Sequence, residues 1–305
     1  MLEEAITKTL AYRDIFDYPL TAEEVWQFLV EEKATKKRVE RALTAMVAKG
    51  LIGGREEFYF LPGRETIVPL RRRRETVSKG KLAKARKRAA WLRLIPWVRA
   101  VFATGAVAVG NADEAADLDI LIVTSPGRLW LARFLVFSVL LLLGAKRKAK
   151  SPIGKDKICP NMFFVSSSLA LPRNERNLYT AHEAVQAKLL WERGSIHRQF
   201  LAENNWIGKF LPNWEPQLRG LEAWKCEGGR GEKEVGKKAV SLAFPPLNFL
   251  EKAAYELQLK YMARRRTTEV VSPERILFHA KDLPAIILAA YRARLDEQQR
   301  AALPL

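Results

Sequence analysis

The chain has few of the residues that build disulfide or metal frameworks. It holds two cysteines in 305 residues, Cys159 and Cys226, and no C-x-x-C pair. This spacing suggests neither a disulfide framework nor a zinc site, and a reducing cytoplasm is the expected compartment. The segment "HEAVQ" starts at His182 like a zinc-protease motif, but the second histidine is replaced by Gln186. We expect His182 to form a hydrogen bond at a helix start instead.

Long hydrophobic runs are also missing. The most apolar stretch, "LWLARFLVFSVLLLLG" (129–144), is broken by Arg133 and leaves ten residues, Phe134 to Leu143, clear of charge. A bilayer-spanning helix needs roughly 18 to 20 such residues, so we expect a buried helix. Because the basic "KRKAK" that follows would suit a membrane surface, membrane association stays open as the less favoured alternative. The first residues, "MLEEAITKTLAYRD", are acidic and amphipathic, unlike a signal peptide.

Acidic residues are scarce relative to basic ones. The chain has 52 Lys and Arg against 34 Asp and Glu, which gives a net charge of +18 and a pI near 10.0. Such an excess favours polyanionic partners, namely nucleic acid, nucleotides or an anionic membrane face. An ordinary solvated basic surface would explain it as well. No G-x-S-x-G, Walker lysine loop or Rossmann glycine triplet is present, so the chemistry must come from another motif.

Residues 1–62 have the pattern of three helices followed by a hairpin. After a first amphipathic helix, "YPLTAEEVWQFL" offers Thr21 as an N-cap with Glu24 three residues later, which is a capping box. A third helix, "TKKRVERALTAMVAKG", has one apolar face and ends at Gly50. The segment "LIGGREEFYFL" then predicts two short strands around a glycine turn.

This order of elements resembles a winged-helix domain. The resemblance implies that exposed basic residues of the third helix contact the phosphates or the groove of DNA or RNA; these are Lys36, Lys37, Arg38 and Arg41. Winged helices also serve as protein interaction modules, and any solvated helix shows a charged outer face. Both uses therefore stay open.

Residues 63–96 are expected to form a basic helical connector. From Arg71 to Arg93 there are eleven Lys and Arg and one acid, Glu75, a net charge of +10. Apolar residues recur every three or four positions, which predicts a helix, and Pro96 marks its end. The helix would either steer polyphosphates or serve as a solvated connector.

Two carboxylates stand at the mouth of an apolar strand in "TGAVAVGNADEAADLDILIVT" (104–124). One strand runs into Gly105, and the first residues of the next carry Asp117 and Asp119. Residues two apart in a strand share a face and lie roughly 6.5 Å apart, and two such carboxylates repel each other unless a cation lies between them. This favours Mg²⁺ or Mn²⁺ completed by substrate phosphates, and the glycine turn would let backbone amides approach a phosphate. A simple strand cap is the alternative.

The segment "TGA", followed after ten residues by "DLD" and "ILIV", resembles the signature of the nucleotidyltransferase-fold superfamily. With "YRDIFDYPLT", "EFYFLPGRE" and "DKICPNMFF", the chain resembles a bacterial group of winged-helix proteins with nucleotidyltransferase-like domains. The resemblance implies Thr104, Gly105 and Ala106 as the nucleotide-binding turn, and Asp117 and Asp119 as catalytic metal ligands. The implied reaction moves a nucleoside monophosphate from a nucleoside triphosphate to RNA, protein or a small molecule.

Two positions depart from that signature. Ala106 replaces the usual serine, and Asn161 stands on a later strand where active members often carry a third carboxylate. Asn161 could ligate magnesium through its amide oxygen but could not act as a base, whereas Asp156 might supply an acid from a loop. The alternative function is therefore a nucleic-acid-binding winged-helix regulator whose nucleotidyltransferase domain is degenerate and only binds nucleotide or supports the fold.

Together the patterns predict an α/β (α+β) fold in four parts. These are a winged-helix domain (1–62), a basic connector (63–96), a nucleotidyltransferase-like core with a mixed sheet (97–172) and a helical C-terminal region (173–305). Within the last part, "CEGGRGEKEVGKK" (226–238) predicts an exposed loop.

Overall fold

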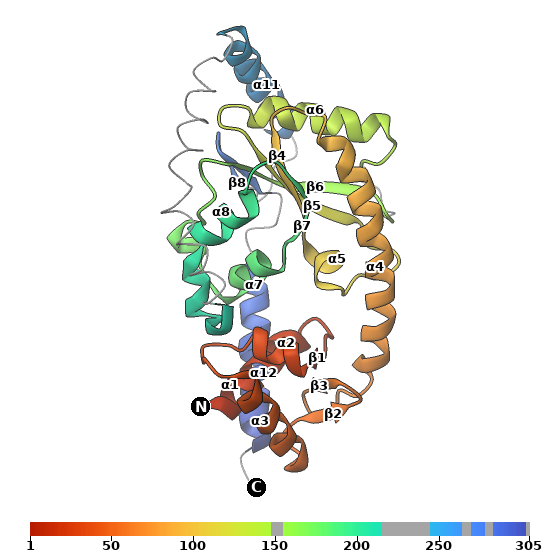
Figure 1. The fold of residues 1–305 in the computed structure, drawn as a ribbon, viewed down its shortest axis with the longest axis vertical. Helices are drawn as coiled ribbons and strands as arrows, with labels where there is room; N and C mark the ends of the chain where they lie inside the picture. Colours follow the sequence, from red (N-terminus) through yellow and green to blue (C-terminus); the bar gives the residue numbers. More distant parts are fainter. Residues whose placement is uncertain (148–154, 215–244, 264–269, 278–282, 303–305) are drawn as a thin grey trace.

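The computed structural model of the chain is a mixed α/β structure with a three-stranded and a six-stranded sheet (Figure 1). This confirms the expected α+β class and the mixed central sheet. The structure describes residues 1–147, 155–214, 245–263, 270–277 and 283–302, so the loop expected at 226–238 lies outside the described residues.

The N-terminal unit contains the three helices and the hairpin that the sequence predicts. Its elements are α1 (Leu2–Asp14), β1 (Leu20–Thr21), α2 (Ala22–Gln27), α3 (Lys36–Ala48), β2 (Gly53–Arg55) and β3 (Phe58–Phe60). The strands form an antiparallel sheet in the order β1-β3-β2. The capping box of Thr21 and Glu24 is present at α2. The apolar face of α3 is buried in the core of the unit through Val39, Leu43 and Met46.

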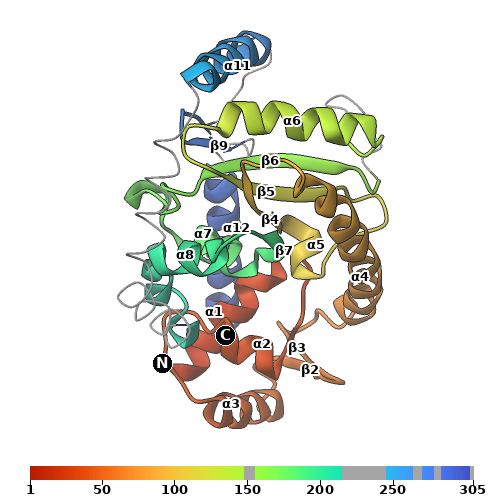
Figure 2. The ribbon, with the colours of Figure 1, turned by 45° about the horizontal axis from the view of Figure 1, so that its top comes forward.

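Helix α4 (Ile67–Leu92) runs from the N-terminal unit to the central sheet (Figures 1 and 2). Near its start, Arg71 is buried and bonds to Glu24 of α2 at 2.9 Å. Near its end, Ala89 and Leu92 are buried in the core of the sheet. The start of the helix therefore packs against the N-terminal unit, and its end packs against the central sheet.

The central sheet has the strand order β7-β4-β5-β6-β9-β8. Strands β5 and β6 are parallel, and the other neighbours are antiparallel. Its strands are β4 (Val98–Ala103), β5 (Leu118–Thr124), β6 (Ile158–Val165), β7 (Lys188–Glu192), β8 (Val270–Val271) and β9 (Arg275–Leu277). The short helix α5 (Gly105–Val109) connects β4 with β5.

Helices cover both faces of this sheet (Figure 2). Along β5, Ile120 and Ile122 point to the face packed by α4, α6 (Leu129–Leu142) and α11 (Pro245–Ala263). The alternate residues Leu121 and Val123 point to the opposite face. That face is packed by α7 (Leu178–Gln186), α8 (Ile196–Glu203), α12 (Leu283–Ala302) and part of α1.

Two sequence expectations need correction. The region from residue 173 is not only helical, because β7, β8 and β9 complete the central sheet. These strands have two to five residues and lie at or near the sheet edge, so they lack a long apolar run. Helix α6 is buried on one face only: Val136 and Leu140 are buried, whereas Leu141 and Leu142 are exposed. None of the helices that the structure describes is both long and apolar enough to cross a membrane.

The remaining short elements precede or follow α8. They are the 3₁₀ helices η1 (Arg173–Glu175), η2 (Asn205–Lys209) and η3 (Pro212–Trp214). Phe200 and Trp206 are buried in the core here, so the aromatic residues of this segment form packing contacts.

Candidate metal centre

The two predicted carboxylates converge at the start of β5. Because side chains alternate along a strand, Asp119 shares the face of Leu121 and Val123, which is the α7 side of the sheet. The ligand atoms of Asp117, Asp119 and Cys159 all lie within 4.8 Å of one another. This group could hold a metal ion.

The parallel strand β6 supplies two further side chains to the group. Cys159 lies opposite Asp119 in the strand register, and Asn161 Nδ2 donates a hydrogen bond to Asp119 Oδ1 at 2.9 Å. Asn161 thus lies where the sequence predicted, but it contacts the carboxylate as a donor rather than through its carbonyl oxygen. Cys159 was not predicted, since only the register between the two strands brings it to Asp119.

The electrostatics of the group suit a cation. Burial and the neighbouring Asp117 carboxylate raise the pKa of Asp119 to about 6, because both effects disfavour a second negative charge. Burial and the same two carboxylates raise the pKa of the Cys159 thiol to about 12. The protonated thiol is a poor ligand for a hard ion, so the two carboxylates are the main oxygen ligands in this set.

A protein cation already lies at the edge of the group. Arg147 follows α6 and forms an ion pair with Asp117 through its guanidinium. The guanidinium and a metal ion would share the Asp117 carboxylate. A bound metal ion would therefore have to displace Arg147, unless Arg147 pairs with another anion at the same time. Arg147 itself is exposed, which leaves it room to turn toward another anion.

The glycine turn packs directly against Asp119. Gly105 has φ +61°, and a Cβ at this position would lie 3.1 Å from Asp119 Oδ2. Both the left-handed backbone and the close approach therefore require glycine. The Thr104 amide donates to the Asp119 carbonyl at 3.0 Å, and Ala106 is exposed. Thr104 Oγ1 is buried without a hydrogen-bond partner among the described residues, and no side chain caps the first turn of α5.

Helix α7 brings another acid toward the pair. Burial and the charge of Asp119 raise the pKa of Glu183 to about 7. One turn earlier, burial and the charges of Glu183 and Asp119 raise the pKa of Tyr179. Helix α7 packs on α5 and on the face of the sheet that carries Asp119. The sequence gave no local sign of this acid, because Glu183 is 64 positions from Asp119 along the chain.

The neighbouring His182 is not at a helix start, as we had expected. It lies in the middle of α7, whose N-cap is Asn177. It is buried and stacks on Tyr12 with ring centroids 4.1 Å apart, and Arg13 Nη2 lies 3.5 Å from its Nδ1. Burial and Arg13 lower the pKa of His182 well below its usual value, so the ring is neutral. It joins α1 to α7.

Asp156 does not join the acid pair. Its carboxylate bonds to Lys81 at 3.0 Å and to Lys84 at 2.5 Å, both on α4. Although burial raises it, these hydrogen bonds keep the pKa of Asp156 below its usual value. Asp156 therefore attaches α4 to the segment before β6.

The basic residues of α4 are largely bound within the molecule. Arg72 pairs with Glu56 and Glu57, Arg73 with Glu114, and Lys79 with Glu75. The Lys79 pair lies within α4, whereas Arg71, Arg72, Arg73, Lys81 and Lys84 attach the helix to the N-terminal unit, the loop before β5 and the loop before β6. These contacts support the connector interpretation of this helix over polyphosphate steering.

The four predicted nucleic-acid contacts lie on α3, away from the acid pair (Figure 1). Lys36, Lys37, Arg38 and Arg41 are all exposed. Lys36 forms an ion pair with Glu23. For the other three, no ion pair is found within the described part of the chain.

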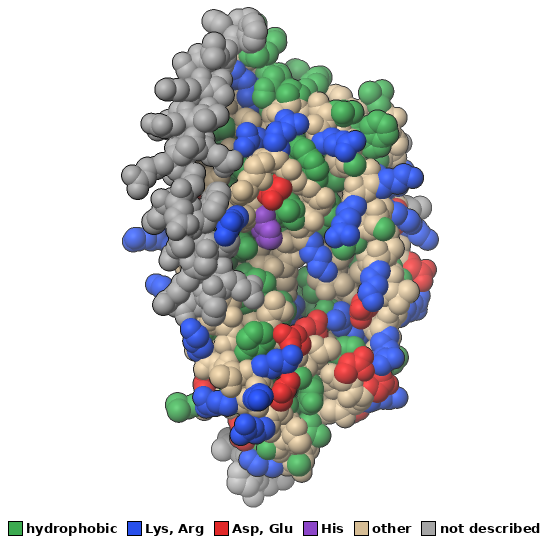
Figure 3. Space-filling model, in the orientation of Figure 1, with side chains coloured by type: hydrophobic (Ala, Val, Ile, Leu, Met, Phe, Trp, Pro, Cys, Tyr) green, Lys and Arg blue, Asp and Glu red, His purple; other side chains and the backbone are tan. Residues whose placement is uncertain are grey.

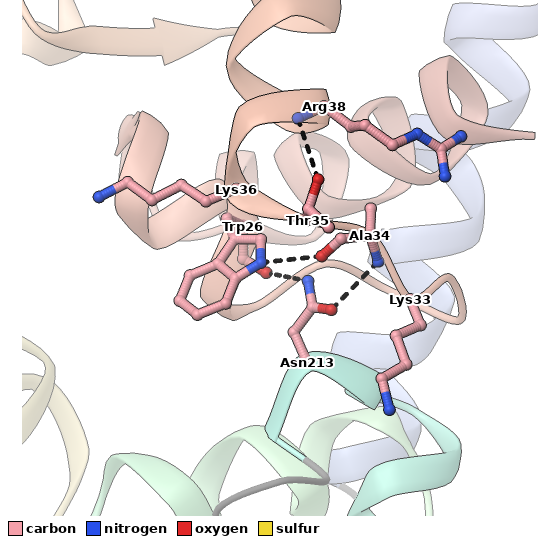
Figure 4. Close-up of a pocket in the computed structure, with 7 residues that line it drawn as sticks. All are labelled: Trp26, Lys33, Ala34, Thr35, Lys36, Arg38 and Asn213. Atoms are coloured by element: carbon pink, nitrogen blue, oxygen red, sulfur yellow. Dashed lines mark hydrogen bonds between the residues drawn. The ribbon is translucent and has the colours of Figure 1, made fainter.

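A shallow pocket of about 430 Å³ lies at the start of α3 (Figure 4). Trp26 Nε1 donates to the Ala34 carbonyl at 2.9 Å, and Asn213 of η3 bonds to both the Ala34 amide and the Trp26 carbonyl. The side chains of Lys36 and Arg38 point in different directions at its rim (Figure 4). Since its central polar groups bond to each other, they join α2 and the loop before α3 to η3, and the pocket offers no convergent catalytic groups.

Comparison with known proteins adds no family to this picture. No protein-family model matches the chain, and searches of curated proteins and of solved structures find no match.

Proposed function

We propose that the protein is a magnesium-dependent nucleotidyltransferase that moves a nucleoside monophosphate from a nucleoside triphosphate to an acceptor. The observation that carries the proposal is the close approach of Asp117 to Asp119, together with the packing of Asp119 on the Gly105 turn. Two close carboxylates beside a turn without a side-chain cap suit a cation and phosphate oxygens at the same place.

Each residue of the site has a distinct part in this proposal. Asp117 and Asp119 would hold Mg²⁺ or Mn²⁺, which neutralises phosphate charge and positions in-line attack when bound. The Gly105 turn would accept the triphosphate, with the buried Thr104 hydroxyl as a hydrogen-bond donor. Arg147, released from Asp117, would pair with a phosphate oxygen.

Glu183 supplies the third acid that Asn161 does not. A carboxyl group with a pKa of about 7 can accept a proton at neutral pH, as a general base for an acceptor hydroxyl must. Its proximity to Asp119 supports an active transferase over a degenerate domain.

The decisive experiment incubates the protein with each labelled nucleoside triphosphate, magnesium, and RNA, protein or small-molecule acceptors. The variant carries Asp117→Ala and Asp119→Ala, and Mn²⁺ affinity is measured in parallel by electron paramagnetic resonance. A matched control carries Glu65→Ala and Asp296→Ala, which removes two exposed acids outside the site. We expect transfer and Mn²⁺ binding in the wild type and the control alone. Transfer that is equal in all three proteins, or absent from all, would contradict the proposal.

A second candidate function is nucleic-acid binding by the N-terminal unit, which we propose to be a winged helix. Lys37, Arg38 and Arg41 support it, because they are exposed and form no ion pair with the described residues. This function requires only a nucleotide-binding or supporting role for the central domain. Salt-dependent binding of duplex DNA or RNA by the full chain, without any label transfer, would favour it over the transferase.

A further inference from the structure

One end of the molecule exposes large apolar side chains on two adjacent helices. On α6, Leu141 is 68% and Leu142 is 87% exposed; on α11, Phe249 is 73% and Leu257 is 63% exposed. The two helices pack against each other (Figures 1 and 2). Figure 3 shows hydrophobic side chains gathered over this end. Exposed apolar side chains that gather at one end of a molecule mark an interaction site.

Helix α11 has apolar residues on both of its sides. One side packs on α6: Glu251 accepts hydrogen bonds from the Trp130 and Leu131 amides at 2.8 and 3.0 Å, and Gln258 donates to the Trp130 carbonyl at 2.8 Å. The other side exposes Phe249, Leu250 and Leu257, which fall within one arc at about 100° per residue. The exposure of these three side chains shows that no described residue covers this side of α11.

The charges around this surface are mainly positive. Helix α11 exposes Lys252 and Lys260 against one exposed acid, Glu256, and Lys146 is half-buried after the end of α6. Glu251 is already bound to α6. In Figure 3, Lys and Arg side chains lie along the border of the hydrophobic area. The last turn of α4, which contacts α6, is followed by the exposed Arg93 and Leu94.

We propose that this end of the molecule binds the surface of an anionic membrane. The exposed side chains of α6 and α11 would enter the boundary between headgroups and acyl chains, and the surrounding Lys and Arg would attract acidic headgroups. Attachment is peripheral, since α6 has 14 residues and a spanning helix needs about 20. A second copy of the chain fits less well, because a symmetric contact would bring two basic borders together.

Vesicle flotation of the full chain tests this proposal. Vesicles of equal parts phosphatidylcholine and phosphatidylglycerol are compared with vesicles of phosphatidylcholine alone, at low and at high salt. We expect flotation with the anionic vesicles that weakens with salt. Two exposed apolar side chains are removed in Phe249→Ser with Leu257→Ser, and separately in Leu141→Ser with Leu142→Ser. Each pair should lower the partition coefficient at least about tenfold.

Two controls separate membrane binding from other causes. Leu51→Ser changes an exposed leucine on the N-terminal unit and should leave flotation unchanged, and circular dichroism should show that all variants fold. Absence of flotation for the wild type, or equal flotation for the apolar variants, would overturn the proposal. So would a dimer in sedimentation experiments that the same variants abolish, because the apolar surface would then bind a second copy.

Discussion

The acid site on β5 and the basic face of α3 both carry charge, but they arrange it in opposite ways. At β5, ligand atoms of three side chains lie within 4.8 Å of one another, and the pKa of Asp119 is raised to about 6. On α3, the basic side chains are exposed and spread along one helix. Buried charges act on each other strongly, whereas exposed charges are screened by water and salt.

This difference determines how much each residue can contribute to the function of its site. A buried group of carboxylates specifies geometry and chemistry, so one substitution should remove most of its function. A solvated basic face supplies a sum of small phosphate contacts, so no single residue should be essential. Four experiments test this contrast, and the largest effect is expected at Glu183.

Replacing Glu183 by Gln should reduce nucleotidyl transfer by about 100-fold, because the amide cannot accept a proton. The limb of the pH–rate profile near pH 7 should disappear with it. The melting temperature above pH 7 should not fall, since the variant no longer buries a charge. A control, Glu192→Gln on β7, should keep both the rate and the profile. An unchanged rate in Glu183→Gln would remove this residue from the site.

Replacing Gly105 by Ala should weaken Mn²⁺ binding by roughly 30-fold, since the added Cβ would lie 3.1 Å from Asp119 Oδ2. Gly127 is the matched control: it has φ +65°, and a Cβ there would meet nothing within 4 Å. Both variants carry a similar backbone strain of about 1–2 kcal/mol. If the two variants lost Mn²⁺ affinity equally, strain rather than the contact with Asp119 would be the cause.

The raised pKa of Asp119 predicts a pH dependence of metal binding. Below about pH 6 the carboxyl of Asp119 is protonated, so a metal ion must displace a proton to bind. The affinity for metal therefore decreases as the pH is lowered. Mn²⁺ affinity should be about tenfold lower at pH 5 than at pH 7. Isothermal titration in buffers of different ionisation enthalpy would detect the released proton. An affinity that stays constant between these pH values would show that Asp119 is not a ligand.

The contrast between the two regions also shows what the sequence can predict. Local signals predicted the capping box at Thr21, the buried face of α3, and the placement of Asp117 and Asp119 at the start of a strand, because each depends on neighbouring residues. The approach of Cys159 depends on the register of β5 and β6, and that of Glu183 on the packing of α7. Neither can be found from local spacing.

Competition between contacts explains two other differences between the sequence predictions and the structure. Asp156 lies five positions before Asn161 in the chain, but its carboxylate pairs with Lys81 and Lys84 of α4. Helix α6 has no polar face, so its sequence predicts burial on all sides. The structure packs α11 on part of its surface and leaves Leu141 and Leu142 exposed.

The smallest effect per residue is expected on α3. Combining Lys37→Ala, Arg38→Ala and Arg41→Ala should lower duplex affinity by about eightfold, which is roughly twofold for each exposed contact. The slope of log affinity against log salt should fall by up to about three. A control with the same loss of charge combines Arg173→Ala, Lys209→Ala and Arg292→Ala, all exposed residues outside the N-terminal unit. Equal losses in the two triple variants would show that net charge, and not the α3 face, determines binding. A far larger loss from one α3 residue alone would mean that this face, like the acid site, depends on a specific contact.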